Sequence, residues 1–498
     1  MRGLLLAYAA LLAGLAGLAV VYNLWAHRPG ALALLLVGLL LGAAAFFLLR
    51  RIAAPELAPR RERAWLLGIL GLALVVRVAW CAAVPTFPVS DARGYQRMAV
   101  DLVERGEFDR EDALRINGLV VLGPPHPTAF WMPGYPLLLA AGYRVFGVTL
   151  WWGYVLNFLL AAGMQLALFY VVRCFAGGFW GLLAAATVGF YPAFVVTASV
   201  LTTDAAGPAW LAIAAALGLA SVRHAGRQRL ALAAACGLVM GATVHFRPVL
   251  LPLVLVIAVG LYVLCLRPAY RRGTPALPPL AFLLMIAATL VPWVARNYVV
   301  LGRPILLTSA SAQAMYVNNV AYDTDDINPK DPLITQPNEA LRISLMEAAA
   351  QAWIRAHPGR YALRGAKRLG LAFASDHELL GMAAIQGPEG RERDLLAPPV
   401  RAGINALADL SWGFWFGAAL AAMGAAAGGR RRYPTLPPAA QAYVVLGLTT
   451  LLWLAVAVFA TASESRYHYP WVPLAIGSVL ILAARRPEPV DPTVSGPA

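Results

Sequence analysis

Ionisable side chains at the ends of long apolar runs are the residues of this sequence best placed to do chemistry. A charge inside or at the rim of a bilayer is costly, so each such residue is a functional candidate. One side chain taken alone is equally well explained as a snorkelling arginine or as half of a buried ion pair. The set on one side of the predicted membrane is Arg77, Asp91, Asp204, His245, Arg247, Arg296, Glu464, Arg466 and His468. Their shared depth predicts a site for an anionic phospholipid headgroup.

Two aspartates of this set have two interpretations each. Asp91 follows a pair of prolines, where an apolar run ends and a helical pattern begins, so it either caps that helix or serves as a general base. Asp204, within the triplet TTD, is either a helix cap or a residue that supports the site from behind. The segment 123–136, GPPHPTAFWMPGYP, is predicted to be a rigid turn that places Trp131 and Tyr135 at the membrane interface.

The composition requires that most of the chain lie in lipid. Of 498 residues, 60% are hydrophobic and 13% are charged, against roughly 25% charged in a soluble chain. The net charge of +15 reflects arginines in the linkers, and no basic tract interleaved with aromatic residues indicates a nucleic-acid partner. The four cysteines lie in or beside apolar runs without metal-ligand spacing, which predicts neither a disulfide nor a cysteine metal site.

Twelve apolar runs are long enough to cross a bilayer as helices, which takes about 20 residues. They lie near 3–25, 31–49, 64–84, 150–174, 179–199, 204–222, 230–245, 248–266, 279–299, 404–427, 438–460 and 468–485. The sequence therefore predicts an all-α polytopic membrane protein with about twelve transmembrane helices.

Arginines fall in alternate linkers between these runs, as expected of short cytoplasmic loops. The basic linkers are 50–63, 223–229, 267–272, 430–432 and 485–486. Both termini are therefore predicted to be cytoplasmic, in a bacterial-type inner membrane. The linker 85–149 also carries arginines, but the rule loses force in linkers longer than about 60 residues.

Two polar segments are predicted to lie outside the membrane on the extracytoplasmic face. The first, 85–149, contains a helical pattern in which Tyr95 and Met98 share one face. The second, 301–403, contains a helix that Asn338 is expected to cap and a basic amphipathic helix near 359–374. The predicted units are two extra helices in 1–63, a seven-helix module in 64–300, the loop 301–403, a three-helix module in 404–486 and a disordered cytoplasmic tail, 487–498.

Several segments resemble membrane glycosyltransferases of the C-type (GT-C) fold. A span ending in Arg77, followed by SDARGYQRMAVDLVERGEF and WMPGYPLLLA, resembles the first loop of that family, in the branch of the protein O-mannosyltransferases and the lipid A aminoarabinose transferase. Further similar segments, in the same order over about 64–475, are TASVLTTDAAGPAW, HFRP, VARNYVVLGRPILLTSAS, HPGRYALRGAKRLGLAF and SRYHYPWVP. The resemblance implies a seven-helix module with the catalytic loop after its first helix.

The resemblance also implies a reaction and a set of roles. Asp91 matches the catalytic aspartate, and the implied donor is a sugar on a polyprenyl phosphate, transferred to a hydroxyl of a glycan, lipid or protein. The resemblance further implies that Arg296 and Arg466, with Arg247 as a weaker match, lie near the phosphate. The rim position adds Arg77 and His468 to the residues predicted at the lipid phosphate. The residues predicted behind the site or on the acceptor side are Tyr95, Tyr135, Asp204 and Glu464. The first loop lacks the family's Asp-Glu or Asp-x-Asp pair. No cofactor is therefore assigned, and a divalent metal remains compatible but unsupported.

Three other functions fit the composition. A polysaccharide polymerase or ligase shares lipid-linked substrates. A secondary transporter also has about twelve spans, but it typically shows internal repeats and interrupted helices at the midplane. A scaffold without chemistry is the third alternative, and the sequence does not distinguish it from an enzyme. Charges at the rim rather than at mid-depth favour the transferase.

Overall fold

The computed structural model describes most of the chain. The described residues are 1–110, 113–116, 119–122, 126–320, 333, 336, 338–383, 385–386, 393–428, 436–461 and 464–484. The predicted tail 487–498, the basic linkers 430–432 and 485–486, and most of the polar stretch 322–336 lie outside these residues.

The protein is a bundle of long apolar helices, as predicted. Ten helical stretches in the described part are long and apolar enough to cross a membrane. They are α1 (Arg2–Trp25), α2 (Pro29–Leu49), α3 (Pro59–Ala83), α6 (Leu150–Ala176), α9 (Ala206–Arg223), α10 (Gly226–Phe246), η2 (Pro248–Leu250) with α11 (Leu253–Leu266), α12 (Leu277–Leu301), α16 (Pro398–Gly428) and α17 (Pro438–Thr461). The all-α polytopic class is confirmed.

The predicted run 179–199 is a bent pair rather than a straight span. It forms α7 (Gly178–Gly189), then α8 (Pro192–Val196) continued by η1 (Thr197–Ser199), and the two parts meet at 58°. The break falls at Tyr191, whose ψ of 121° is extended because the next residue, Pro192, excludes the helical conformation before it. Counting this pair gives up to eleven spans among the described residues.

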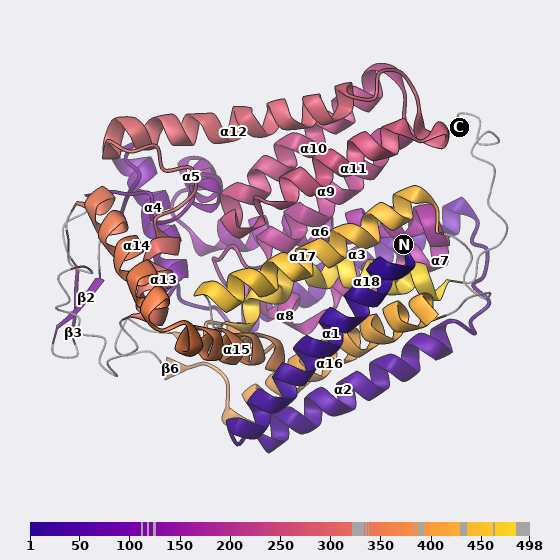
Figure 1. Cartoon of the computed structure of the whole chain (residues 1–498), viewed down its shortest axis with the longest axis horizontal. Helices are drawn as coiled ribbons and strands as arrows, with labels where there is room; N and C mark the ends of the chain where they lie inside the picture. The colour runs from indigo at the N-terminus through magenta and orange to yellow at the C-terminus, as the bar shows by residue number, and fades with distance from the viewer. Residues whose placement is uncertain are drawn as a thin grey trace.

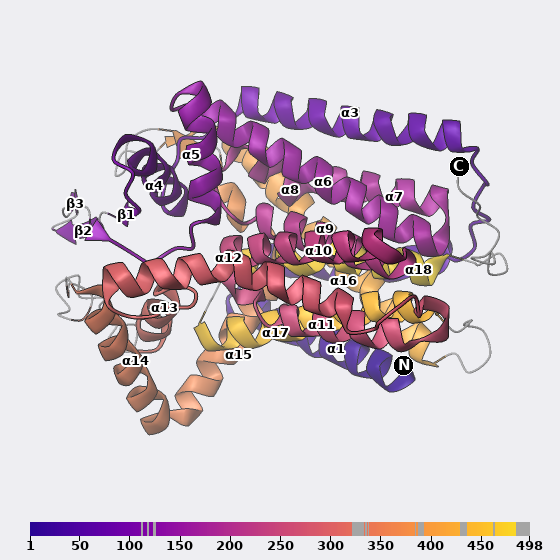
Figure 2. The ribbon, with the colours of Figure 1, turned by 90° about the horizontal axis from the view of Figure 1, so that it is seen from above.

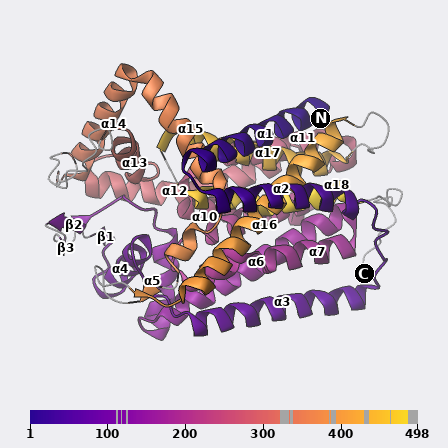
Figure 3. The same ribbon diagram turned by 90° about the horizontal axis from the view of Figure 1, so that it is seen from below.

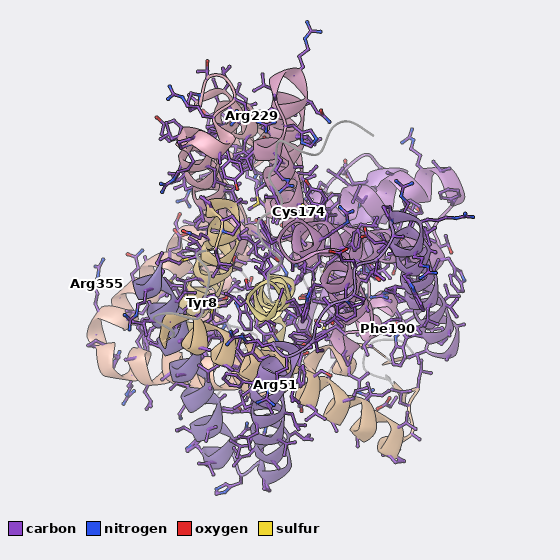
Figure 4. The ribbon with its side chains drawn as sticks, turned by 90° about the vertical axis from the view of Figure 1, so that its right-hand side faces the viewer. Tyr8, Arg51, Cys174, Phe190, Arg229 and Arg355 are labelled. Atoms are coloured by element: carbon purple, nitrogen blue, oxygen red, sulfur yellow. The ribbon has the colours of Figure 1, made fainter. Side chains whose placement is uncertain are left out.

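The predicted run 468–485 is not one continuous α-helix. It forms the 3-10 helix η6 (Ser465–Trp471), which leads directly into the α-helix α18 (Val472–Ala483). Every residue of α18 is buried, and Figure 4 shows it end-on in yellow among the other helices. The described residues thus give ten or eleven spans where the sequence predicts about twelve, because hydropathy does not distinguish a helix buried by protein from one facing lipid.

The two ends of the bundle differ. In Figure 1 the start of α1 and the α2–α3 and α11–α12 connections lie at one end, and the linkers predicted to be extracytoplasmic lie at the other. That second end carries α4 (Asp91–Glu104), α5 (Gly134–Phe146), α13 (Ala310–Asn319), α14 (Glu339–Ala356) and α15 (Pro358–Ala374). Figure 2 shows α3 along one flank of the bundle. The arrangement separates the described basic linkers from the described parts of the two polar segments, as the arginine pattern predicts.

The extramembrane helices begin and end as the sequence predicts. The Asn338 side chain accepts a hydrogen bond from the Leu341 amide at 3.0 Å and so caps α14. Pro358 starts α15, the predicted basic amphipathic helix. Small antiparallel pairs complete the loops: β1 (Asp109–Arg110) with β4 (His126–Pro127), β2 (Ala113–Ile116) with β3 (Leu119–Leu122), and β5 (Ile385–Gln386) with β6 (Arg393–Asp394).

The first two helices pack on the C-terminal part of the chain. Figure 3 shows α2 beside α16, and glycines make the approach close. A Cβ on Gly38 or Gly42 would collide with the backbone of α16, and one on Gly417 would collide with Leu39 of α2. Gly413 lies opposite Gly38, so both helices use glycines four residues apart, the spacing that brings membrane helices together.

Candidate functional site

The site forms where three distant parts of the chain meet at the loop end of the bundle. Arg466, in η6, is its centre: Nη2 lies 3.2 Å from Oδ2 of Asp91, Nη1 lies 3.3 Å from Oδ2 of Asp204, and Nε lies 2.5 Å from Oε2 of Glu464. The Arg466 side chain is 12% exposed. Burial lowers the pKa of Arg466, but Glu464 and Asp91 outweigh burial and raise it above its ordinary value. Arg466 therefore stays a cation in the site.

Asp91 is a helical residue rather than a cap. Ser90 occupies the N-cap position of α4 with φ of 50° and makes no side-chain capping bond, and Asp91 is the first residue of the helix. A carboxylate there is favoured by the helix dipole. Its side chain is 33% exposed, so one face of this ion pair is open to water.

Asp204 holds two arginines from behind. It is 2% exposed, forms an ion pair with Arg247 as well as Arg466, and accepts a hydrogen bond from the Thr202 hydroxyl. The N-cap of α9 is Ala205, so Asp204 does not occupy that position. A Cβ on Gly207 would collide with the Arg247 side chain, so this glycine provides the room that Arg247 needs. The interpretation of Asp204 as a supporting residue fits this geometry.

The cluster contains more carboxylates than guanidinium groups. Two guanidinium groups, Arg247 and Arg466, meet three carboxylates, Asp91, Asp204 and Glu464. Asp204 is buried, whereas Asp91 and Glu464 are 33% and 37% exposed. The two exposed carboxylates are therefore the ones that can turn toward water when another anion approaches.

Aromatic residues support the start of α4. The Tyr95 ring lies 5.1 Å from Trp131 and 5.6 Å from Tyr135, measured between ring centroids. Burial, with the nearby charge of Asp91, raises the pKa of Tyr95 to about 12, so its hydroxyl remains protonated. Tyr135 is fully buried and donates to Asn157 at 3.3 Å. The interface position expected for Tyr135 is therefore wrong, because the ring is enclosed by protein.

Three residues predicted at the phosphate have other described contacts. Arg296 donates to the carbonyls of Thr128 at 2.7 Å and Phe108 at 2.9 Å, and so fastens the first loop to α12. Arg77 is 1% exposed within α3 and donates to the Ala73 carbonyl at 3.1 Å. None of the ion pairs of the cluster described above involves Arg296, Arg77 or His468. Their proposed contact with a lipid phosphate stays a prediction.

A second polar network, missed in the sequence, fixes the segment that carries Arg466. Asp376 accepts a hydrogen bond from Tyr191 at 2.7 Å and lies 2.8 Å from Nε2 of His468, and all three side chains are buried. His468 also stacks on Trp412, with ring centroids 3.7 Å apart. Burial raises the pKa of Asp376. The network thus ties η6 to α15 and α16 and fixes the position of its backbone.

The position of Asp376 in the sequence already marked it as a candidate. Asp376 lies between the amphipathic helix and the next apolar stretch, at the rim of an apolar run like the other candidates. Its neighbour His377 contacts Asp409 of α16, with Nδ1 2.8 Å from Oδ2. The same criterion that selected Asp91 applies to Asp376, but only the folded chain shows that it faces His468.

The side chains that the structure describes do not form a metal site. Among the residues that the structure describes, no three histidine, cysteine, aspartate or glutamate side chains gather as a metal site. The carboxylates of the cluster are paired with arginines instead. A divalent ion in this site stays an alternative left open by the sequence.

Comparison with known proteins gives likenesses at the level of solved structures. No protein-family model and no curated protein matches this chain. The oligosaccharyltransferase AglB from Archaeoglobus fulgidus, in complex with an inhibitory peptide and a dolichol-phosphate, is 12% identical with a TM-score of 0.46, over 84% of this chain and 50% of that chain. ArnT from Cupriavidus metallidurans, bound to undecaprenyl phosphate, is 15% identical with a TM-score of 0.37, over 84% and 77%.

Both neighbours are membrane glycosyltransferases of the GT-C fold, the family that the sequence segments resemble. This chain spans about half the length of the oligosaccharyltransferase it matches. With TM-scores below 0.5, these likenesses say nothing about the substrates of this chain.

Proposed function

We propose that the protein is a membrane glycosyltransferase that moves a sugar from a polyprenyl-phosphate carrier to a hydroxyl group of a glycan, lipid or protein acceptor. The proposal places the site on the extracytoplasmic face of a bacterial-type inner membrane. The observation that carries it is the contact of Arg466 with Asp91. A guanidinium fixed from behind by Asp204 presents one nitrogen to a partly exposed carboxylate at a helix N-terminus.

Donor binding and proton transfer are linked in this arrangement. The phosphate of the carrier takes the place of Asp91 at Nη2 and of Glu464 at Nε of Arg466, because guanidinium groups bind phosphate oxygens in pairs. Asp204 keeps the guanidinium oriented during this exchange, and Arg247 lies behind the same carboxylate. Asp91 is then free to accept a proton.

The reaction proposed is a direct displacement. Asp91 accepts the proton of the acceptor hydroxyl, the oxygen forms a bond to the anomeric carbon, and the bond from that carbon to the phosphate oxygen breaks. The phosphate leaves with the electron pair and is stabilised by Arg466. A fixed donor in a site shielded from water contributes about 3 kcal/mol to such a transition state.

The first experiment measures carrier binding and does not require the sugar to be known. Purified protein in detergent is titrated with polyprenyl phosphate, and the thermal unfolding temperature is recorded for the parent and for Arg466→Gln. Arg105→Gln is the matched control, because Arg105 also pairs with an aspartate of α4, at 2.9 Å from Asp101, outside the cluster. A saturable stabilisation is expected in the parent and the control and is expected to be lost in Arg466→Gln.

The second experiment measures turnover. Labelled polyprenyl-phosphate sugars are incubated with the protein and a panel of acceptors, and release of the carrier phosphate is followed. Equal carrier binding by the parent and by Arg466→Gln contradicts the assigned phosphate site. Transport of the intact donor across a vesicle membrane without cleavage contradicts the transferase and favours a transporter.

A further inference from the structure

The end of the bundle opposite the Arg466 cluster contains a crevice of about 570 Å³ between α9, α11 and α17. α9 begins beside Asp204 and α17 ends beside Glu464, and the crevice is lined by the halves of these two helices that lie far from the cluster. α11 lines it from Leu255 to Arg267, so the crevice extends toward the end where α1 starts. Figure 1 shows this end on the right. The crevice is therefore separate from the proposed transfer site.

The lining is apolar and small residues give it depth. Gly218 of α9, Gly260 of α11, and Ala439 and Ala442 of α17 contribute to the wall. A Cβ built on Gly260 meets no atom within 4 Å, so this position faces open space. The rim exposes large apolar side chains of α11, since Leu255 is 67% and Val259 is 59% exposed. The exposed faces of α11 are those that a bilayer surrounds, so a lipid chain can enter the crevice from the side.

The mouth of the crevice is basic. Arg267, which ends α11, lines it. The adjoining segments 223–229 and 267–272 contain six arginines and neither aspartate nor glutamate. Within the described residues none of the six forms an ion pair, and the buried Arg229 donates to the Arg272 carbonyl and to Cys265 instead. Figure 4 views this end and labels Arg229.

We infer that this crevice binds an anionic phospholipid of the leaflet around it, with one acyl chain between α11 and α17 and the phosphate at Arg267. Basic pockets between transmembrane helices are sites for anionic headgroups, because uncompensated arginines attract them. The apolar walls gain from excluding water and from contact with the chain. The acyl chain of a zwitterionic lipid would also fill the apolar crevice, but such a lipid has no net negative charge to neutralise the arginines.

The test uses full-length protein stripped of lipid in mild detergent. Phosphatidylglycerol, phosphatidylcholine and polyprenyl phosphate are each added, binding is counted by native mass spectrometry, and thermal unfolding is measured in parallel. Phosphatidylglycerol is expected to bind saturably and to raise the unfolding temperature. Gly260→Leu is expected to reduce this binding by tenfold or more by filling the crevice, and Arg267→Gln by about fivefold for the anionic lipid alone.

Two controls match these variants. Gly71→Leu adds the same side chain to α3, where a Cβ also meets nothing within 4 Å, but Gly71 does not line the crevice. Arg271→Gln removes a charge from the same linker as Arg267 without touching the lining. Both controls are expected to bind phosphatidylglycerol as the parent does. Ala442→Leu, from the facing helix, fills the same crevice and serves if Gly260→Leu does not fold.

Three results would overturn the inference. One is unchanged phosphatidylglycerol binding in both crevice-filling variants. Another is an equal loss in Arg271→Gln and Arg267→Gln, which would mean diffuse attraction to the surface. The third is polyprenyl phosphate binding the parent more tightly than phosphatidylglycerol and losing that binding in Gly260→Leu, which would assign the crevice to the carrier chain.

Discussion

Replacing Asp91 with asparagine separates proton transfer from structure. Asparagine keeps the size of the side chain and an oxygen that can accept from Arg466, which lies 3.2 Å from the carboxylate. It cannot accept the proton of an acceptor hydroxyl. Loss of a positioned general base lowers turnover by roughly 10²- to 10⁴-fold, or about 3 to 5 kcal/mol of activation free energy.

The expected loss of stability is smaller. At an effective dielectric constant of 20, two charges 3.2 Å apart attract by about 5 kcal/mol before desolvation is counted. Asp91 is 33% exposed, and Arg466 keeps Asp204 and Glu464 as partners, so screening reduces the net loss to about 1 kcal/mol. Loss of a negative charge from the first turn of α4 adds about 0.3 to 1 kcal/mol.

The assay measures release of carrier phosphate from a polyprenyl-phosphate sugar, with thermal unfolding in parallel. Asp101→Asn is the matched control, since Asp101 lies on the same helix and pairs with Arg105 at 2.9 Å outside the cluster. Turnover of Asp91→Asn within about threefold of the parent refutes the role of Asp91 as the base. An equal loss of turnover in Asp101→Asn shows that damage to α4, rather than loss of the base, is responsible.

Three other substitutions have defined outcomes. Arg466→Lys is expected to bind polyprenyl phosphate about tenfold more weakly than the parent in a thermal-shift titration, because an ammonium group cannot bind two oxygens in parallel; parental affinity would contradict this. The hydrogen bond to Asp409 raises the pKa of His377 above its ordinary value. Protonated His377 therefore contributes fully to the stability of the folded protein below about pH 6.5, and this contribution is lost as pH rises through the folded-state pKa. His377→Asn should therefore flatten the fall of unfolding temperature above pH 6.5, and an unchanged slope would exclude this contribution. Gly42→Val should lower stability by about 1 to 3 kcal/mol by forcing α2 from α16, while Gly71→Val, on open space, should not; equal unfolding temperatures would contradict the close packing.

The sequence alone was sufficient for the class of protein and for the segregation of its loops. Apolar runs of about 20 residues leave few alternatives to spanning helices, since the backbone must satisfy its hydrogen bonds within the lipid. The arginine linkers predicted which connections share an end of the bundle, and Asn338 and Pro358 marked helix boundaries through local chemistry. These features depend on neighbouring residues only.

The number of spans required the tertiary structure. α18 is about as apolar as α2, most of whose residues are not buried, yet all residues of α18 are buried by other helices. The bend after α7 followed from one proline, but its 58° angle is visible only in the folded chain. Burial by protein and burial by lipid have the same apolar pattern, so the sequence cannot separate them.

The functional site was partly predictable from the positions of charged residues along the sequence. Asp91, Asp204, Arg247, Glu464 and Arg466 were selected because charges at the rim of apolar runs are costly, and the fold brings all five together. The same criterion also selected Arg296 and His468, whose described partners are loop carbonyls and a buried aspartate. The cost of a charge at the rim is a property of its depth, which sequence predicts. Arg466, which offsets this cost for Asp91 and Asp204, lies 375 and 262 residues away from them in the sequence, and only the packing of the helices decides that they meet.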